Sequence, residues 1–302
     1  MPTTAIIAIV LTVTLGFLEL LRLGFDAYQS VTYQPEFFAR IMGPTTLLAG
    51  SHVLTAAAFA GAIVLLFARN VGRVIAIALA GTSASMAADA LPRDTLQMVE
   101  YLALRLHASA AYVALELATI VVSVAVMVLL SSKHVSRWLR ARRKAQATGS
   151  DVPTKRPVGV MIALGLLCIV VLGLLVQTYF TMTAPAFGAD SQLESLAFNS
   201  GFLAVPLAAL VAVVLATIGK KAGWTLTVAV SGFTLFFGYR RMVLFAHSFT
   251  VDASPNPDLV EWMYQGGVVV ALLASAATII ILTGRKQVDW FHSRQRAIVD
   301  NR

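Results

Sequence analysis

Charged side chains inside long apolar stretches are the residues of this sequence that could do chemistry. Glu116 lies near the middle of the apolar run 100–131, and Tyr112 and Arg105 fall on the same helical face. An ionisable residue at bilayer depth is costly and usually marks a functional site. We therefore expect Glu116 and Asp89 to exchange protons and Arg105 to stabilise developing negative charge. The alternative is a polar seam that only holds helices together.

Other polar residues fall at a similar depth, towards one end of their apolar runs. Buried charges need partners, so acids and arginines of different helices, Arg22 among them, are expected to pair. This predicts one polar site shared by several helices and open towards the outer face. Its candidate ligand-binding residues are His107, Arg240, Arg241, Tyr112, Glu19 and His247.

Two histidines, His52 and His107, are predicted to lie at similar depths on two helices that both run inward. If those helices face each other, each histidine could ligate a b-type haem through one ring nitrogen. The alternative is a hydrogen-bonded histidine between helices, or a proton relay. The single cysteine, Cys168, rules out an internal disulfide and a cysteine-based iron–sulfur site.

The composition decides what kind of element must position these residues. Of 302 residues, 58% are hydrophobic and 13% are charged, against about 25% charged residues in a soluble domain. This excludes a soluble globular enzyme. A spanning helix needs about 20 apolar residues, and strands are excluded because the runs show no period-two alternation. The sequence therefore predicts an all-α, polytopic membrane protein with eight transmembrane helices, at 4–24, 44–68, 73–91, 100–131, 157–182, 195–218, 222–248 and 264–284.

The distribution of lysine and arginine predicts the orientation in the membrane. If the N-terminus is cytoplasmic, the segments 69–73, 132–157, 219–221 and 285–302 all lie on the cytoplasmic side. They hold 2, 8, 2 and 5 basic residues, which makes 17 of the 23 in the chain. By the positive-inside rule this predicts a bacterial inner-membrane protein with both termini cytoplasmic.

The long basic segment also divides the chain. We expect an N-terminal four-helix half at 1–132, a basic cytoplasmic linker at 133–156 and a C-terminal four-helix half with a short basic tail at 157–302. Because the basic run directly follows a spanning helix, we expect no nucleic-acid partner. The two halves resemble each other in hydropathy, which we take as an architectural analogy.

Three segments resemble the polysulfide/DMSO reductase membrane-anchor family. Tyr179–Phe187 is similar to the family's aromatic–proline–aromatic outer loop, with Leu196–Gly201 as the small-residue start of the next helix. Gly238–Phe245 is similar to its glycine–arginine–aromatic helix. The resemblance implies an eight-helix quinol-reactive subunit with a site near the outer face. Two departures are that Asp89 stands near the place of the family's histidine before proline, and that a further span follows the arginine–aromatic helix.

The sequence thus favours an integral subunit of a quinone-linked respiratory oxidoreductase, with quinone bound near the outer face and haem b as an optional second cofactor. Whether the chain is itself an enzyme stays open. We expect an electron-transfer subunit to dock on the acidic outer loops. The alternatives are a small-solute or proton-coupled transporter or channel, in which Glu116 couples to protons, and a membrane assembly protein.

Overall fold

In a computed structural model, the structure describes residues 1–33, 51–67, 70–100, 106–144, 157–183, 203–251, 259–284 and 286–291. This part of the chain contains helices and no strand, which confirms the all-α prediction. In chain order the helices are α1 (Thr3–Tyr33), α4 (Ser51–Leu66), α5 (Asn70–Glu100), α6 (Leu106–Leu130), α7 (Lys133–Lys144), α8 (Val158–Thr183), α10 (Ala204–Ile218), α11 (Lys221–Val251) and α12 (Leu259–Thr283).

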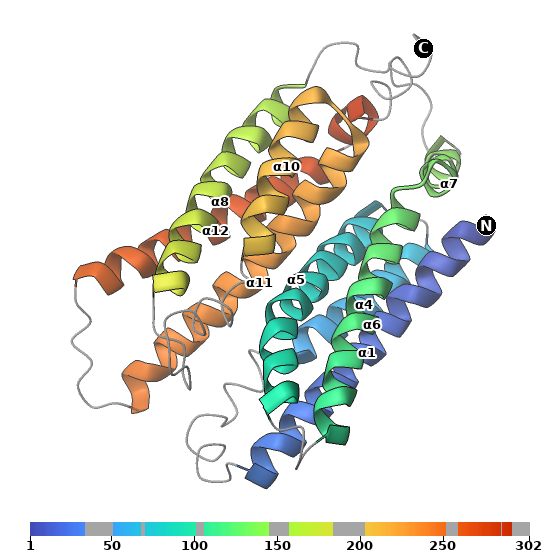
Figure 1. The fold of residues 1–302 in the computed structure, drawn as a ribbon. Helices are drawn as coiled ribbons and strands as arrows, with labels where there is room; N and C mark the ends of the chain where they lie inside the picture. Colours follow the sequence, from blue (N-terminus) through green and yellow to red (C-terminus); the bar gives the residue numbers. More distant parts are fainter. Residues whose placement is uncertain are drawn as a thin grey trace.

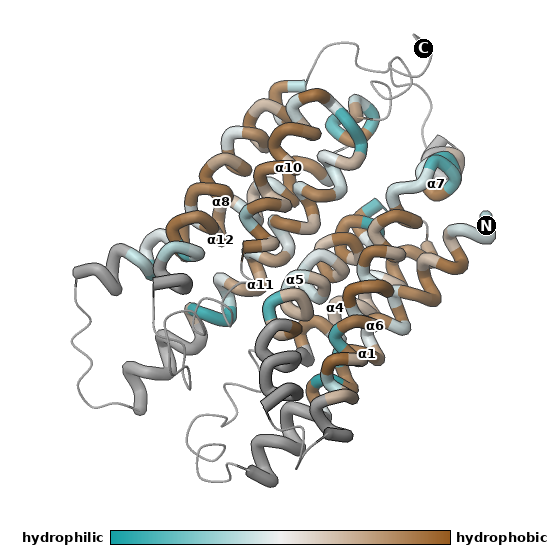
Figure 2. The backbone as a smooth tube through the Cα atoms, viewed as in Figure 1, coloured by the Kyte–Doolittle hydropathy of each residue, from teal (hydrophilic) through white to brown (hydrophobic). Residues whose placement is uncertain are grey.

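Six helices of the described residues are long and apolar enough to cross a membrane: α1, α5, α6, α8, α11 and α12. The chain is therefore a multi-pass membrane protein. α4 and α10 are apolar but have 16 and 15 residues, and both predicted runs continue into residues outside the described part. Eight spans and the sides of the termini remain predictions. Figure 2 shows apolar residues along most of the length of the long helices and hydrophilic residues gathered on α7.

The helices do not end where the apolar runs end. α1 and α5 each continue nine residues past the predicted runs, to Tyr33 and Glu100, into segments expected to be outer loops. An apolar run predicts which part of a helix contacts lipid. The helix itself can continue past that run, because its backbone groups still form hydrogen bonds with each other. The predicted linker 133–156 likewise begins with a helix. α7 buries Val135 and Leu139 and exposes Lys133, the pattern of an amphipathic helix.

The apolar helices of the described part form two groups of four with the same packing pattern (Figure 1). In the N-terminal half, α1 packs on α4 and α6, and α5 packs on the same two helices. In the C-terminal half, α8 packs on α10 and α12, and so does α11. The third helices of the two halves, α5 and α11, pack against each other and join the halves.

Small residues make the contact between α5 and α11. A Cβ on Gly81 would overlap Ala229 of α11, and a Cβ on Gly232 would lie 2.6 Å from the carbonyl oxygen of Ala78 of α5. The two backbones therefore approach closely, as small residues allow in membrane helix pairs. Adding 151 to Ala78 and Gly81 gives Ala229 and Gly232. The contact is thus reciprocal, as it is between two-fold related helices.

The hairpins that precede these helices obey the same register. Gly72 lies against the backbone of Leu65, and Gly223 lies against the backbone of Ala216. Adding 151 to the first pair gives the second. The analogy between the halves therefore extends from hydropathy to individual helix contacts.

Polar contacts tie the halves together at the end where α1 begins, which is also the end of α7 in Figure 1. Lys221 Nζ donates to the Ser132 carbonyl at 3.1 Å and to Ser136 Oγ at 2.7 Å. The buried Trp224 donates from Nε1 to the Leu282 carbonyl at 3.2 Å. The guanidinium of Arg73 lies 4.5 Å from the centre of the Trp224 ring. These contacts link the starts of α5 and α11 to α7 and to the end of α12.

Candidate functional site

A buried ion pair joins α1 to α6 inside the N-terminal half. Arg22 Nη2 lies 2.9 Å from Glu116 Oε1, and the two side chains are 10% and 2% exposed. A charge-assisted hydrogen bond of this length is strong, and burial removes it from competing water. The structure thus gives Glu116 a cationic partner from another helix.

Two further candidates lie one turn away from this pair. Glu19 on α1 and Tyr112 on α6 are both buried. The threonines of the same polar faces have a different role, because Thr12 and Thr119 donate their hydroxyls to backbone carbonyls of their own helices at 2.7 and 2.8 Å. These threonines are packing residues. The residues of this half that could exchange protons or bind a ligand are therefore the ionisable ones.

A small cavity between the two halves brings three charged side chains together, and we call it the charged pocket. Its volume is about 70 Å³. Arg22 reaches it from α1, Asp89 from α5 and Arg240 from α11. With Glu116 behind Arg22, the cluster holds two arginines and two acids. The remaining lining residues are Ser85, Met86, Val205, Phe233 and Phe237.

The charged pocket lies far from the end that carries α7. Asp89 is 19 residues after the start of α5 at Asn70, and Arg240 is 19 residues after the start of α11 at Lys221. At about 1.5 Å per residue each lies about 28 Å along its helix. The hydrocarbon core of a bilayer is about 30 Å thick. The candidate membrane spans of α5 and α11 end at Leu91 and Met242, so the pocket lies near the end of both spans that is farther from α7.

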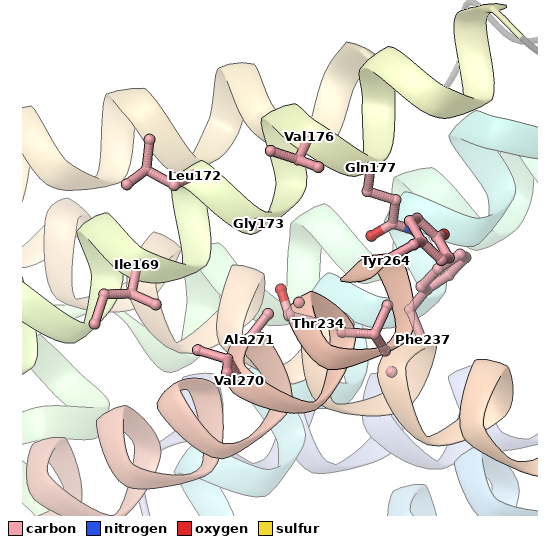
Figure 3. A pocket seen from close by; sticks show the side chains of 13 residues that line it. Ile169, Leu172, Gly173, Val176, Gln177, Thr234, Phe237, Tyr264, Val270 and Ala271 are labelled. Atoms are coloured by element: carbon pink, nitrogen blue, oxygen red, sulfur yellow. The ribbon is translucent and has the colours of Figure 1, made fainter. Parts of the chain in front are cut away.

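A larger cavity lies within the C-terminal half between α8, α11 and α12 (Figure 3). Its volume is about 280 Å³, and we call it the groove. Ile169, Leu172, Val176 and Val270 line it and are themselves exposed, so the groove opens on the face that lipid covers.

One end of the groove is polar. Gln177 and Tyr264 lie close to Phe237 at this end, whereas Ile169 and Val270 lie at the other (Figure 3). Phe237 also lines the charged pocket, so one aromatic ring borders both cavities. Phe233 stacks on that ring with centroids 5.6 Å apart, and the Arg241 guanidinium lies 5.2 Å from its centre.

Four predicted site residues are not placed by the structure. Arg105 lies outside the described residues. The backbones of His52, His107 and His247 lie in α4, α6 and α11, but their side chains are outside the described part. α4 and α6 each pack on α1 and α5, which puts them at opposite corners of the N-terminal half. Haem ligation by His52 and His107 would have to cross the centre of that half, and it remains a prediction.

No group of three or more histidine, cysteine or acidic residues gathers among the side chains that the structure describes. Sequence reasoning also missed Gln177, Phe237 and Tyr264. For Gln177 a signal existed, since it is the single amide side chain in the apolar run 157–182. For the other two the signal was absent, because an aromatic residue in a membrane helix is ordinary.

The chain matches no protein-family model, no curated protein and no solved structure. The two cavities and the buried charges are therefore the features of the described residues that bear on its function. Of the segments from which a resemblance to the polysulfide/DMSO reductase membrane anchors was predicted, Gly238–Phe245 lies in α11 and carries Arg240 into the charged pocket. Leu196–Gly201 lies outside the described residues.

Proposed function

We propose that this chain is the membrane subunit of a quinone-linked respiratory oxidoreductase of the bacterial inner membrane. The observation that supports the proposal is the charged pocket between the halves, next to a groove that opens to lipid. Quinone and quinol interconvert by transfer of two electrons and two protons. A site for this reaction needs a group that exchanges protons and a cation that stabilises negative charge on a quinone oxygen.

The residues of the pocket divide these roles. The Asp89 carboxyl exchanges a proton with the quinone oxygen, and the Arg240 guanidinium stabilises the charge on that oxygen before the proton arrives. Arg22 and Glu116 form a buried ion pair behind them. Arg105 and His107 are expected at the same end of the bundle. The electrons come from or go to a partner subunit with a one-electron redox group, which docks on the acidic outer loops.

The volume of the charged pocket limits what it can hold. Binding sites for small organic ligands usually measure about 300–1,000 Å³, and this pocket measures about 70 Å³. It has room for water or a single functional group, not for a quinone ring with its substituents. In this proposal the pocket is the place of proton exchange and charge stabilisation, and the ring lies beside it.

A second candidate function is a proton-coupled transporter. The observation that favours it is the position of the pocket between two halves with the same packing pattern, where transporters built from repeats bind their substrates. In that function Glu116 and Asp89 would take up protons as the halves move. Proton uptake into proteoliposomes on addition of a solute gradient, lost in Glu116→Gln, would favour the transporter over the quinone subunit.

The quinone proposal is tested by binding to the purified protein in nanodiscs. A benzoquinone and a naphthoquinone that each carry one isoprene unit are titrated, with tryptophan fluorescence as the readout. We expect both Asp89→Asn and Arg240→Gln to weaken binding of the preferred quinone at least tenfold. Asp289→Asn is the matched control, because it removes the same kind of carboxylate from the short helix 286–291 that follows α12 and does not line the pocket. Binding that is unchanged in both pocket variants would overturn the assigned proton-exchange site, and a wild type that binds neither quinone would overturn the quinone proposal itself.

A further inference from the structure

Glycines form the floor of the groove. A Cβ on Gly173 of α8 would lie 3.0 Å from the Ala271 Cβ, and a Cβ on Gly238 of α11 would lie 3.2 Å from the Leu272 Cβ. Gly267 of α12 is different, because a Cβ there would meet nothing within 4 Å. The groove is thus open space that a side chain at position 267 would fill.

The register that relates the two halves shows which residues of the N-terminal half correspond to two of the glycines of the groove. Adding 151 to Arg22 and Glu116 gives Gly173 and Gly267. The space between the first and fourth helices of the N-terminal half is filled by the ion pair. The same space in the C-terminal half is lined by two glycines and left open. The two halves share a packing pattern. The N-terminal half has an ion pair at the positions where the C-terminal half has a cavity.

Gln177 gives the groove a buried polar group at its polar end, beside Tyr264 (Figure 3). Its side chain is 7% exposed and lines the groove, and its Nε2 has no hydrogen-bond partner among the described residues. Buried amide groups are nearly always hydrogen-bonded. An acceptor supplied by a ligand, such as a carbonyl oxygen, would satisfy this donor.

The lining also restricts the kind of amphiphile that fits. None of the residues that line the groove carries a charge. Arg241 stands beside its polar end, against Phe237, so a phospholipid phosphate would be met by this one guanidinium and by no charged residue of the lining. Gln177 and Tyr264 stand at one end, and the hydroxyl of Thr234, nearer the middle, donates to the Val230 carbonyl of its own helix (Figure 3). The apolar walls open to lipid along the rest. This distribution matches a molecule with a small uncharged polar ring and a long apolar chain.

We propose that the groove between α8, α11 and α12 is the seat of the quinone itself. The ring lies at the polar end against Phe237, where Gln177 Nε2 donates a hydrogen bond to one carbonyl oxygen. The isoprenoid chain runs over Gly267 and past Leu172 into the bilayer. The inference rests on the proposed function and adds a position for the ring: it lies beside Phe237, which lines both cavities, in a groove of about 280 Å³ next to a charged pocket of about 70 Å³.

The test compares two adjacent glycines of α12. Gly267→Leu fills the groove, whereas Gly266→Leu places the same side chain at an exposed neighbouring position that does not line it and where a Cβ also meets nothing within 4 Å. The titration described above is repeated with these variants and with Gln177→Leu. We expect Gly267→Leu to weaken quinone binding at least tenfold, Gln177→Leu to weaken it about three- to tenfold, and Gly266→Leu to bind as the wild type does.

A second measurement locates the chain directly. A quinone with a photoreactive diazirine in its isoprenoid chain is cross-linked in nanodiscs, and the modified peptides are mapped by mass spectrometry. Cross-links on Ile169, Leu172 or Val270 that disappear in Gly267→Leu and persist in Gly266→Leu support the proposal. Cross-links to other helices overturn it, and so does a photoreactive phospholipid that labels these walls and is not displaced by quinone.

The two proposals fail separately in these experiments. If Asp89→Asn and Arg240→Gln weaken binding but Gly267→Leu and Gln177→Leu do not, the pocket keeps its role and the groove is not the seat of the quinone. If the groove variants weaken binding and the pocket variants do not, the groove holds the quinone and the assigned proton site is wrong. A wild type that binds no quinone contradicts both.

Discussion

At the scale of single residues, the ion pair between Arg22 and Glu116 shows what the sequence could and could not predict. The cost of charge in a bilayer made it certain that Glu116 faces protein or water. Its partner could not be read from the sequence, because several arginines lie at a similar depth and the packing of α1 on α6 selects one of them. For the same reason Asp89 and Arg240 were expected in one site, but their shared pocket required the contact of α5 with α11.

Removing one member of the pair is expected to destabilise the protein strongly. Glu116→Leu leaves the Arg22 guanidinium buried without its carboxylate, which in soluble proteins costs about 3–5 kcal/mol. The double variant Arg22→Met with Glu116→Leu replaces both charges with apolar groups and should unfold close to the wild-type temperature. Thermal unfolding in detergent, followed by circular dichroism, compares them. Losses that simply add in the double variant would show that the pair contributes no coupling.

At the scale of helices, the apolar runs predicted which helices exist. They did not predict the residues at which these helices end. α1 and α5 continue to Tyr33 and Glu100, because backbone hydrogen bonding outlasts the apolar stretch. α7 was not predicted, because the basic charge of its segment suggested a linker. Its buried positions Val135, Ser136 and Leu139 recur at three- and four-residue intervals, which is a helical signal that the density of lysine and arginine obscures.

The contact between α5 and α11 makes a prediction about glycines. In Gly81→Ala the new Cβ would overlap Ala229, so the helices must separate or the variant must lose stability. Overpacking of this kind costs about 1–3 kcal/mol. Gly165→Ala on α8 is the control, because a Cβ there meets nothing within 4 Å. We expect a lower unfolding temperature for Gly81→Ala alone, and equal temperatures for the two variants would contradict the close approach of α5 and α11.

At the scale of the whole molecule, the two halves match helix by helix although their sequences share few residues. A register of 151 residues carries Gly72, Ala78 and Gly81 onto Gly223, Ala229 and Gly232, all of them at close contacts. It also carries Asp89 onto Arg240 and so places opposite charges at equivalent positions of the charged pocket. Hydropathy could suggest the division into halves. It could not show this register, because the positions that keep it are small residues scattered among interchangeable apolar ones.

The orientation of the molecule in the membrane decides which side the charged pocket faces, and it can be measured with single cysteines. In a Cys168→Ser background, Ala141→Cys places one thiol on the exposed face of α7. Asp190→Cys places one in a segment predicted to be outside and beyond the described residues. The positive-inside rule predicts that a membrane-impermeant maleimide labels Ala141→Cys in inside-out vesicles only and Asp190→Cys in intact cells. Labelling of Ala141→Cys in intact cells would show that the topology is the opposite of the predicted one. Since the pocket lies about 28 Å along α5 from Asn70, that result would move the proton-exchange site and its partner subunit to the cytoplasmic face.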